Sequence, residues 1–241
     1  MTSMDRLKQM AAIEAVKLIE ADMVVGLGTG STAAFAVEAL GERVAKGLRI
    51  VGIPTSERTA AQAEALGIPL GSFAIHARID LTIDGADEVE VGSLNLIKGL
   101  GGALLREKIV ASASQKLVII VDESKLVEHL GTKTAVPVEV VPFGWQATKL
   151  RLEDLGATVN LRVSQETTFI TDGGHYILDC KFGSMADPKL LESQIAQTVG
   201  VVESGLFIGM TSQVIVAGAS GIRVLVKKVY YPDNGISKAK E

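Results

Sequence analysis

The chain has 241 residues, of which 47% are hydrophobic and 22% are charged, and its net charge is −4. This composition is typical of a folded protein and argues against an intrinsically disordered one. The acidic balance and the small share of aromatic residues, 4%, argue against a nucleic-acid-binding protein, which needs basic patches and stacking surfaces.

Three features of the sequence bear on the location of the protein. Asp5, Arg6, Lys8 and Glu14 interrupt the apolar residues near the start of the chain, so we expect no signal peptide. No apolar run approaches the about 20 residues that a membrane span requires. Cys180 is the single cysteine, which excludes an internal disulfide and any fold that depends on one. We therefore expect a cytoplasmic protein with no membrane partner.

Hydrophobic patterning in the first half of the chain predicts alternating helices and strands. Helices are expected over 5–20, 31–46, 56–66 and 104–112, and strands over 23–27, 49–54, 79–84 and 117–121. The last of these strands, Leu-Val-Ile-Ile-Val, has the continuous apolar character of a strand that is buried on both faces. Alternation of this kind indicates a parallel sheet with helices on both sides.

The pattern changes near Pro137. The expected order is then strand 138–141, helix 147–155, strands 158–163, 167–170 and 175–180, helix 188–198 and strand 201–207. This order is nearly βαββαβ, which is typical of a ferredoxin-like α+β unit. We expect the Asp-Gly-Gly turn at 172–174 to join strands 167–170 and 175–180 into a hairpin. Two further strands, 213–217 and 223–226, are expected to return to the first sheet.

The predicted fold class is therefore α/β, a Rossmann-like parallel sheet domain with an inserted smaller ferredoxin-like α+β domain. We assign residues 1–134 and 208–241 to the Rossmann-like domain and residues 135–207 to the ferredoxin-like domain.

One loop-to-helix segment, NLIKGLGGALLREKIVAS at 95–112, brings together a lysine, a glycine-rich turn and a glutamate. Glycine lets the backbone approach a ligand closely, and the start of the following helix directs free N–H groups toward an anion. Lys98 and Glu107 would supply the ammonium and carboxylate that proton transfer next to a carbonyl needs. The alternative is an ordinary glycine-rich connection before a helix with a solvated, charged face.

A second glycine-rich turn, GLGTGSTA at 26–33, follows the first strand and opens a helix. Its backbone amides and the hydroxyls of Thr29, Ser31 and Thr32 could bind a phosphate or a polyol. The spacing also fits a dinucleotide fingerprint, but the second strand ends in GIPTS at 52–56, without the acidic residue that would bind ribose hydroxyls. Three hydroxyls in one turn favour a small phosphate over a pyrophosphate, and a purely structural turn is the remaining alternative.

Charged residues also follow two other predicted strands, as DGADE at 84–88 and DESK at 122–125. The carboxyl ends of parallel strands open onto the edge where α/β proteins bind ligands, so Asp84, Asp87 and Lys125 could face one pocket. The alternatives are an Asp turn that caps the next segment and a solvated lysine. The chain has no Cys/His cluster for a metal and no Gly-x-Ser-x-Gly elbow for covalent acyl chemistry.

Five motifs occur together in this chain: GLGTGST at 26–32, DGADE at 84–88, IKGLGGALLREK at 97–108, DESK at 122–125 and PVEVVPF at 137–143. In order and spacing they resemble the motifs of the type A ribose-5-phosphate isomerase family, and the resemblance covers essentially the whole chain. It implies an aldose–ketose isomerase of the non-oxidative pentose phosphate pathway. Such an enzyme interconverts D-ribose 5-phosphate and D-ribulose 5-phosphate through an enediolate, without metal or organic cofactor.

The resemblance also implies roles for individual residues. Glu107 would be the base that moves a proton between C2 and C1, and Lys98 would stabilise the oxyanion together with nearby backbone amides. Asp84 and Asp87 would hold the sugar hydroxyls, and Asp84 would assist ring opening. The substrate-binding residues that it implies are Thr29, Gly30, Ser31, Thr32, Asp84, Gly85, Ala86, Asp87, Lys98, Gly99, Leu100, Gly101, Lys125 and Lys8.

The resemblance has one departure and one implication for assembly. Many family members carry glycine where this chain has Leu100, so we expect the Leu100 backbone alone to serve the site while its side chain points away. The family is generally dimeric or tetrameric, so we expect a homodimer or homotetramer.

Three other functions stay open at this stage. A non-catalytic sugar-phosphate sensor would need a DNA-reading module, and only one predicted helix precedes the first strand. An amino-sugar phosphate deaminase or another sugar-phosphate isomerase would use the same chemical logic. A dinucleotide-dependent dehydrogenase would have to bind a nicotinamide cofactor.

Overall fold

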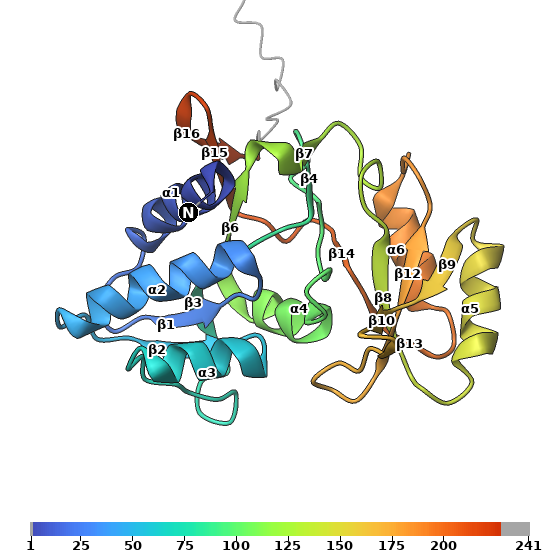
Figure 1. Ribbon diagram of the computed structural model, residues 1–241, viewed down its shortest axis with the longest axis horizontal. Coiled ribbons are helices and arrows are strands. Elements are labelled where there is room, and N and C mark those ends of the chain that lie inside the picture. Colours follow the sequence, from blue (N-terminus) through green and yellow to red (C-terminus); the bar gives the residue numbers. More distant parts are fainter. Residues whose placement is uncertain (1, 228–241) are drawn as a thin grey trace, which may run out of the picture.

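The computed structural model describes residues 2–227, and Figure 1 shows them as two lobes side by side. Residue 1 and residues 228–241, the end of the predicted 208–241 segment, lie outside the described residues. Among the described residues, no helix combines the length and apolar character that a membrane crossing needs.

The first lobe is built on a six-stranded sheet in the order β16-β15-β6-β3-β1-β2. Its elements are α1 (Ser3–Val16), β1 (Val24–Leu27), α2 (Ser31–Ala45), β2 (Val51–Pro54), α3 (Glu57–Ala65), β3 (Ile79–Asp84), α4 (Leu104–Ser112), β6 (Ser114–Asp122), β15 (Gln213–Gly218) and β16 (Gly221–Val226). The pairs among β2, β1, β3, β6 and β15 are parallel, and β16 is antiparallel to β15. The parallel sheet and the return of the last two strands are thereby confirmed.

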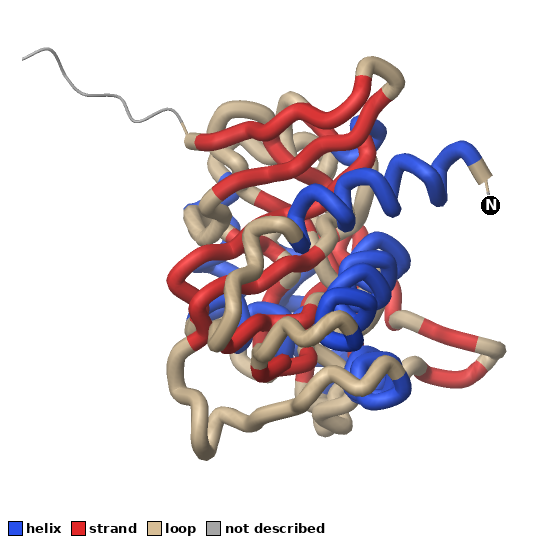
Figure 2. Tube along the Cα trace, turned by 90° about the vertical axis from the view of Figure 1, so that its left-hand side faces the viewer, coloured by secondary structure: helices blue, strands red, loops and turns tan. Residues whose placement is uncertain are grey.

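Strand β6 shows why its sequence is continuously apolar. Val118 and Ile120 pack in the core cluster that includes α1 and α2. Leu117, Ile119 and Val121 pack on the opposite face, in the cluster that includes Ala111 of α4. Successive side chains of a strand point to opposite faces, so a central strand covered by helices on both sides is apolar at every position. Figure 2 shows this lobe from the side, with its helices packed beside the strands.

The second lobe is the predicted ferredoxin-like unit. Its elements are β8 (Val136–Val140), α5 (Trp145–Asp154), β9 (Thr158–Leu161), β12 (Tyr176–Lys181), α6 (Pro188–Ala196) and β13 (Val201–Ser204). The strands form an antiparallel sheet in the order β13-β8-β12-β9, and a separate apolar cluster forms its core. The predicted fold class is confirmed, whereas the domain boundaries at 134/135 and 207/208 stay predictions.

The hairpin predicted across residues 172–174 is wrong. Strand β11 (Thr167–Thr168) pairs with β10 (Val163–Ser164), while β12 pairs with β8 and β9. The β10–β11 turn consists of Gln165 and Glu166, both at positive φ, 48° and 64°. Two-residue hairpin turns of this kind usually contain asparagine or glycine. Neither residue is present here, so composition gave no signal for the turn.

A third sheet, which the sequence did not predict, joins the lobes. It consists of β4 (Glu88–Glu90), β5 (Leu96–Ile97), β7 (Leu126–Val127) and β14 (Leu206–Phe207), in the order β14-β5-β4-β7. The predicted strand 201–207 is divided at Gly205 between β13 and β14. Gly205 donates its N–H to Pro137 O at 2.7 Å and accepts from Lys98 N at 2.9 Å. A Cβ on Gly205 would lie 2.2 Å from Lys98 O, so the position needs glycine.

We therefore expect Gly205→Ala to destabilise the protein. Overpacking a rigid site costs about 1–3 kcal/mol, and the backbone atoms at this junction cannot rotate away. The free energy of unfolding, measured by denaturant titration, should fall by about that amount.

Ser204→Ala is the matched control for this experiment. Ser204 Oγ is buried and has no hydrogen-bond partner within residues 2–227. Removing an unsatisfied hydroxyl is nearly neutral or stabilising, so the control should keep the wild-type free energy of unfolding. Equal stability of the Gly205 variant and the wild type would show that the junction adapts.

Candidate active site

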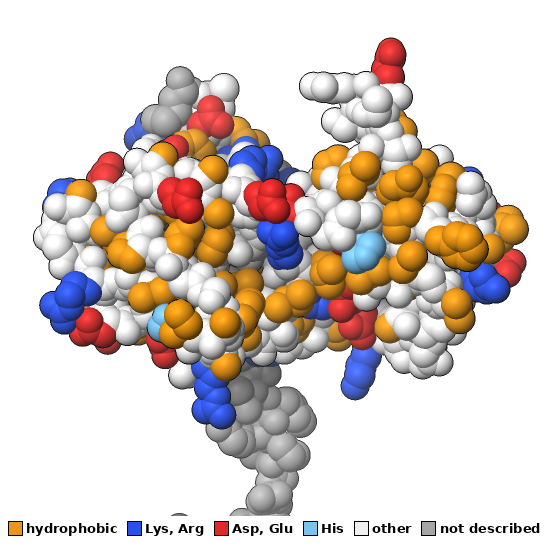
Figure 3. Space-filling model, turned by 90° about the horizontal axis from the view of Figure 1, so that it is seen from below, with side chains coloured by type: hydrophobic (Ala, Val, Ile, Leu, Met, Phe, Trp, Pro, Cys, Tyr) orange, Lys and Arg blue, Asp and Glu red, His pale blue; other side chains and the backbone are white. Residues whose placement is uncertain are grey.

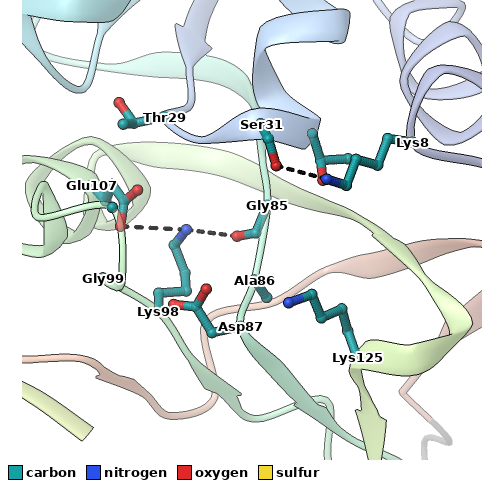
Figure 4. A pocket seen from close by; sticks show the side chains of 12 residues that line it. Lys8, Thr29, Ser31, Gly85, Ala86, Asp87, Lys98, Gly99, Glu107 and Lys125 are labelled. Atoms are coloured by element: carbon teal, nitrogen blue, oxygen red, sulfur yellow. Dashed lines mark hydrogen bonds and ion pairs between the residues drawn. The ribbon is translucent and has the colours of Figure 1, made fainter. Parts of the chain in front are cut away.

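A polar pocket lies at the carboxyl ends of β1, β3 and β6 (Figure 4). This edge is where parallel α/β sheets bind ligands. The pocket is lined by Lys8, Thr29, Ser31, Thr32, Gly85, Ala86, Asp87, Lys98, Gly99, Gly101, Glu107 and Lys125. All twelve are among the residues singled out from the sequence, so the fold brings those separate motifs to one place.

Three ionisable side chains form a buried group at one end of the pocket. Lys98 Nζ lies 2.9 Å from Asp84 Oδ2 and 3.4 Å from Glu107 Oε2, and none of the three side chains is more than 3% exposed. Lys98 Nζ also donates to Gly85 O at 2.6 Å. Buried charges are tolerated only when they are paired. One ammonium cannot fully compensate two carboxylates, so the group favours a proton on one of the two acids.

The two carboxyl groups differ in their hydrogen-bond surroundings. Asp84 Oδ1 accepts from Thr29 N at 3.1 Å and from Gly85 N at 2.8 Å, and these bonds stabilise its charged form. Glu107 Oε2 has no hydrogen-bond partner among residues 2–227. The charged form of Glu107 therefore has less hydrogen-bond support than that of Asp84.

The pKa shifts follow from the same geometry. Burial raises the pKa of Glu107 to about 8, against the opposing effect of Lys98, and Asp84 and Asp87 add to the rise. Burial also raises the pKa of Asp84, while Lys98 and the two backbone N–H groups oppose that rise. For Lys98, burial alone would lower the pKa, but Asp84 and Glu107 outweigh it and the net direction is upward. Lys98 is thus a permanent cation beside a carboxyl group that titrates near neutral pH.

Three of the predicted substrate-binding residues do not line the pocket. Asp84 lies behind Lys98 and is 1% exposed. Gly30 is the N-cap of α2, at φ 119°. Leu100 is 46% exposed, and its backbone N–H donates to Asp87 Oδ2 at 3.0 Å. The side chain of Leu100 therefore stays out of the pocket, and its backbone supports Asp87.

The other end of the pocket is suited to an anion. Lys8 Nζ donates to Ser31 Oγ at 3.0 Å, and α2 begins at Ser31, where the first N–H groups of a helix lack intrahelical partners. Figure 4 shows Lys8 and Lys125 at this end and Lys98 and Glu107 at the other. A positive end and an acid–ammonium end suit a ligand with a phosphate at one terminus.

A hydroxyl cluster beneath the first turn was missed in the sequence. Thr29 Oγ1 lies 2.7 Å from Thr55 Oγ1, 2.8 Å from Ser56 Oγ and 3.0 Å from Thr59 Oγ1. This network ties the turn after β1 to the start of α3. The only sequence signal was the row of hydroxyl residues at the end of β2, and nothing in it specified a contact with Thr29.

Phe207 was also missed as a neighbour of the site. Its ring centroid lies 5.4 Å from Lys98 Nζ and 5.1 Å from Lys108 Nζ, distances at which an aromatic face attracts a cation. The linking strand β14 carries this ring under the buried ammonium group. The two-residue length of that strand left no pattern to find.

Comparison with known proteins agrees with this geometry. The family model for ribose 5-phosphate isomerase A (phosphoriboisomerase A) matches residues 51–221. The chain is 68% identical to ribose-5-phosphate isomerase A of Gloeobacter violaceus over 222 residues, which cover 92% of this chain and 96% of that protein. It is 50% identical to a probable ribose-5-phosphate isomerase 2 of Arabidopsis thaliana over 229 residues, or 91% of this chain and 86% of that protein.

Solved structures show the same likeness. Ribose 5-phosphate isomerase from Plasmodium falciparum matches with a TM-score of 0.90 and 41% identity, over 93% of this chain and 100% of that one. A D-ribose-5-phosphate isomerase in complex with phospho-erythronic acid matches with a TM-score of 0.90 and 40% identity, over 94% of this chain and 100% of that one.

The raised pKa of Glu107 predicts how stability depends on pH. Folding raises this pKa from 4.5 to about 8, so the folded state binds the proton more tightly than the unfolded chain. That contribution is fully present below about pH 4.5 and is lost as the pH rises to about 8. Glu107→Gln stays neutral throughout. We therefore expect the Tm of the variant, relative to the wild type, to increase over this pH range in calorimetry.

The control is Glu57→Gln, which removes an exposed carboxylate. Its Tm difference from the wild type should change little with pH. A Tm difference for Glu107→Gln that is equally flat would mean that Glu107 is ionised at its ordinary pKa.

Proposed function

Because this chain belongs to the ribose 5-phosphate isomerase A family, we propose that the pocket at the carboxyl ends of β1, β3 and β6 is the active site where D-ribose 5-phosphate and D-ribulose 5-phosphate are interconverted. The enzyme is an aldose–ketose isomerase. The observation that carries the assignment of the site is the buried contact of Lys98 with Asp84 and Glu107. It sets an unbonded carboxylate oxygen and a fixed positive charge side by side at the pocket wall.

Glu107 is the base in this proposal. Its carboxylate takes the proton from C2 of the open-chain aldose, and the C–H electron pair forms the C1=C2 bond while the carbonyl pair moves to O1. The same carboxyl group then returns the proton to C1, and the hydroxyl proton of O2 passes to O1, which completes the ketose. A base with a pKa near neutrality can both take and return a proton efficiently, and the pKa of Glu107 is raised to about 8.

Lys98 stabilises the charge that develops on the oxygen. A fixed cation in a water-poor site is more effective than one in water, because it needs no reorganisation as the charge forms. Asp84 holds Lys98 in place at 2.9 Å and acts on the sugar through that lysine. Asp87, which lines the pocket, holds the sugar hydroxyls. We propose that no metal or organic cofactor is required, because Lys98 supplies the positive charge at the reacting oxygen.

The phosphate binds at the opposite end of the pocket. Lys8, Ser31 and Thr32 surround the start of α2, where unpaired N–H groups favour an anion. Lys125, at the end of β6, supplies a second positive charge. Binding the phosphate here directs the other end of the open-chain sugar toward Lys98 and Glu107.

We expect Glu107→Gln to abolish most activity. A positioned base contributes about 10²–10⁴-fold to a rate, and the amide cannot accept the proton. The measurement follows ketose formation from ribose 5-phosphate with EDTA present. Turnover of the wild type that is unaffected by EDTA, together with its loss in the variant, supports both the base and the absence of a metal.

Glu57→Gln serves as the carboxylate control and should keep wild-type turnover, because Glu57 is an exposed residue on α3. If Glu107→Gln retained near-full turnover, Glu107 would not be the base. Loss of wild-type activity in EDTA would contradict metal independence.

We propose a cytoplasmic location for the enzyme. The only cysteine, Cys180, is buried in the core of the ferredoxin-like lobe, so the fold does not depend on the oxidising environment that disulfides require.

We also propose that the protein forms a homodimer or homotetramer through its ferredoxin-like lobe. Phe143 and Val199 are 93% and 74% exposed on this lobe, and Leu150 of α5 is exposed as well. Figure 3 shows hydrophobic side chains spread over this lobe in the view from below. Large exposed apolar groups are typical of surfaces that pair with another protein.

Light scattering should therefore give a mass of twice or four times the chain mass of 25.3 kDa. Phe143→Ser should shift the distribution toward the monomer, because it removes the most exposed of these side chains. A wild-type mass equal to that of one chain would contradict the proposal.

A further inference from the structure

The ferredoxin-like lobe holds the glycine-rich loop that connects Lys98 to the helix of Glu107. Arg162 lies between β9 and β10 on that lobe. Its Nη1 donates to the carbonyl oxygen of Gly99 at 2.9 Å and to that of Leu100 at 3.1 Å. Arg162, which lies outside the pocket motifs of the sequence, thus hydrogen-bonds two successive peptide groups of the loop beside the pocket.

Arg162 is itself rigidly held. Its Nε donates to Asp179 Oδ2 at 2.9 Å, and its Nη2 donates to Asp179 Oδ1, a bidentate pair. Its backbone N–H donates to Ile177 O at 2.8 Å, and its carbonyl accepts from Phe169 N at 3.0 Å. The forked geometry of a guanidinium–carboxylate pair fixes orientation as well as distance. The guanidinium group of Arg162 is therefore held in a fixed orientation toward the loop.

A second contact holds the far end of the same loop. Gly102 is at φ 83°, and a Cβ on it would lie 2.3 Å from the ring of Phe169. The guanidinium carbon of Arg162 lies 6.0 Å from the centroid of that ring. Arg162 and Phe169 thus act on the loop from one side, and Asp87 acts on it from the other through the Leu100 N–H.

The planarity of the peptide bond gives these contacts a consequence for the pocket. The peptides of the described chain are trans, so a carbonyl and the N–H of the next residue point in opposite directions. The Gly99 carbonyl points to Arg162, so the Leu100 N–H of the same peptide points the other way, to Asp87. Arg162 also binds the Leu100 carbonyl, so the N–H of Gly101, a pocket-lining residue, points away from Arg162.

We propose that Arg162 is a positioning residue, which holds the Leu100–Gly101 backbone so that its N–H groups support Asp87 and face the oxygen that becomes charged in the reaction. The inference rests on the proposed function of Lys98 and Glu107. A donor aimed in advance at a developing oxyanion lowers the barrier to reaction. The Gly99 carbonyl also accepts from Gly102 N at 3.0 Å, whereas the Leu100 carbonyl is held by Arg162. Without Arg162 the Leu100–Gly101 peptide would lose its orientation while Lys98 and Glu107 stayed in place.

The test is the kinetics of Arg162→Ala with ribose 5-phosphate. We expect kcat to fall roughly 10- to 100-fold, because loss of one oxyanion donor costs about 10²–10³-fold and a loosened donor costs less. KM should change much less, since the phosphate is bound at the other end of the pocket. Guanidinium ion at millimolar concentration should restore part of the kcat of this variant, relative to sodium chloride at equal ionic strength. A merely structural role would not give this rescue.

A probe of binding makes the same distinction. Phospho-erythronic acid carries a carboxylate where the sugar would carry the charged oxygen. Its affinity should fall in Arg162→Ala in parallel with kcat, whereas the affinity for inorganic phosphate should stay near that of the wild type. Equal loss for both ligands would overturn the proposal.

Glu203→Gln is the matched control. Glu203 of β13 forms another contact between the lobes, 2.7 Å from Lys108 Nζ, but it touches no carbonyl of the loop. It should keep wild-type kcat. A kcat of Arg162→Ala within twofold of the wild type would overturn the proposal, as would an equal, unrescued loss in both variants.

If Arg162→Ala does not fold, Asp179→Asn is the second variant. It keeps the guanidinium group but removes the carboxylate that fixes its orientation. This variant should lose several-fold in kcat, and wild-type kcat would count against the proposal. The two proposals can be contradicted separately. Near-full activity of Glu107→Gln would contradict the assignment of the base, whereas full activity of Arg162→Ala would contradict only the positioning role of Arg162.

Discussion

The site depends on the burial of two carboxyl groups around one ammonium group. In water these three charges would interact weakly, but in the interior their ionisation states become interdependent. Backbone N–H groups support the charged form of Asp84, and Glu107 Oε2 lacks such support. Any change in the fold that admitted water or moved Lys98 would alter all three groups together. The close approach of β1 to β3, at Gly28 and Asp84, is needed for the same reason.

The rest of the structure fixes the position of this buried group relative to the anion site at the other end of the pocket. Three parallel strands end at one edge and supply the hydroxyl turn, the acidic turn and Lys125, while the linking sheet supplies Lys98. The two lobes meet at the backbone of Lys98, through Gly205 on one side, and at the following loop, through Arg162 on the other. The ferredoxin-like lobe is therefore part of the catalytic framework as well as a candidate surface for assembly.

The sequence predicted the features that local patterns encode. The apolar run of β6 predicts a strand that is covered on both faces, and charged residues after strand ends predict a shared edge. The family resemblance, rather than a local pattern, implied lining residues such as Gly85 and Ala86. The sequence did not predict pairing that depends on distant partners. The strands of the linking sheet are two or three residues long and have no periodicity, and Gln165 and Glu166 give no turn signal. Arg162 lies in an alternating segment, where nothing indicates that its side chain reaches Gly99.

The hydrogen bond between Gly205 and Pro137 also bears on how the chain folds. Strands β6 and β15 are adjacent, although Leu117 of β6 and Ser212, just before β15, which hydrogen-bond to each other, are 95 positions apart. An unstructured loop of that length would add to the entropic cost of closure and slow the pairing. The bond holds the two ends of the ferredoxin-like lobe together. Once that lobe has folded, the connection between β6 and β15 is shortened to the residues outside the lobe, and the first sheet closes as though the insertion were an ordinary crossover between parallel strands.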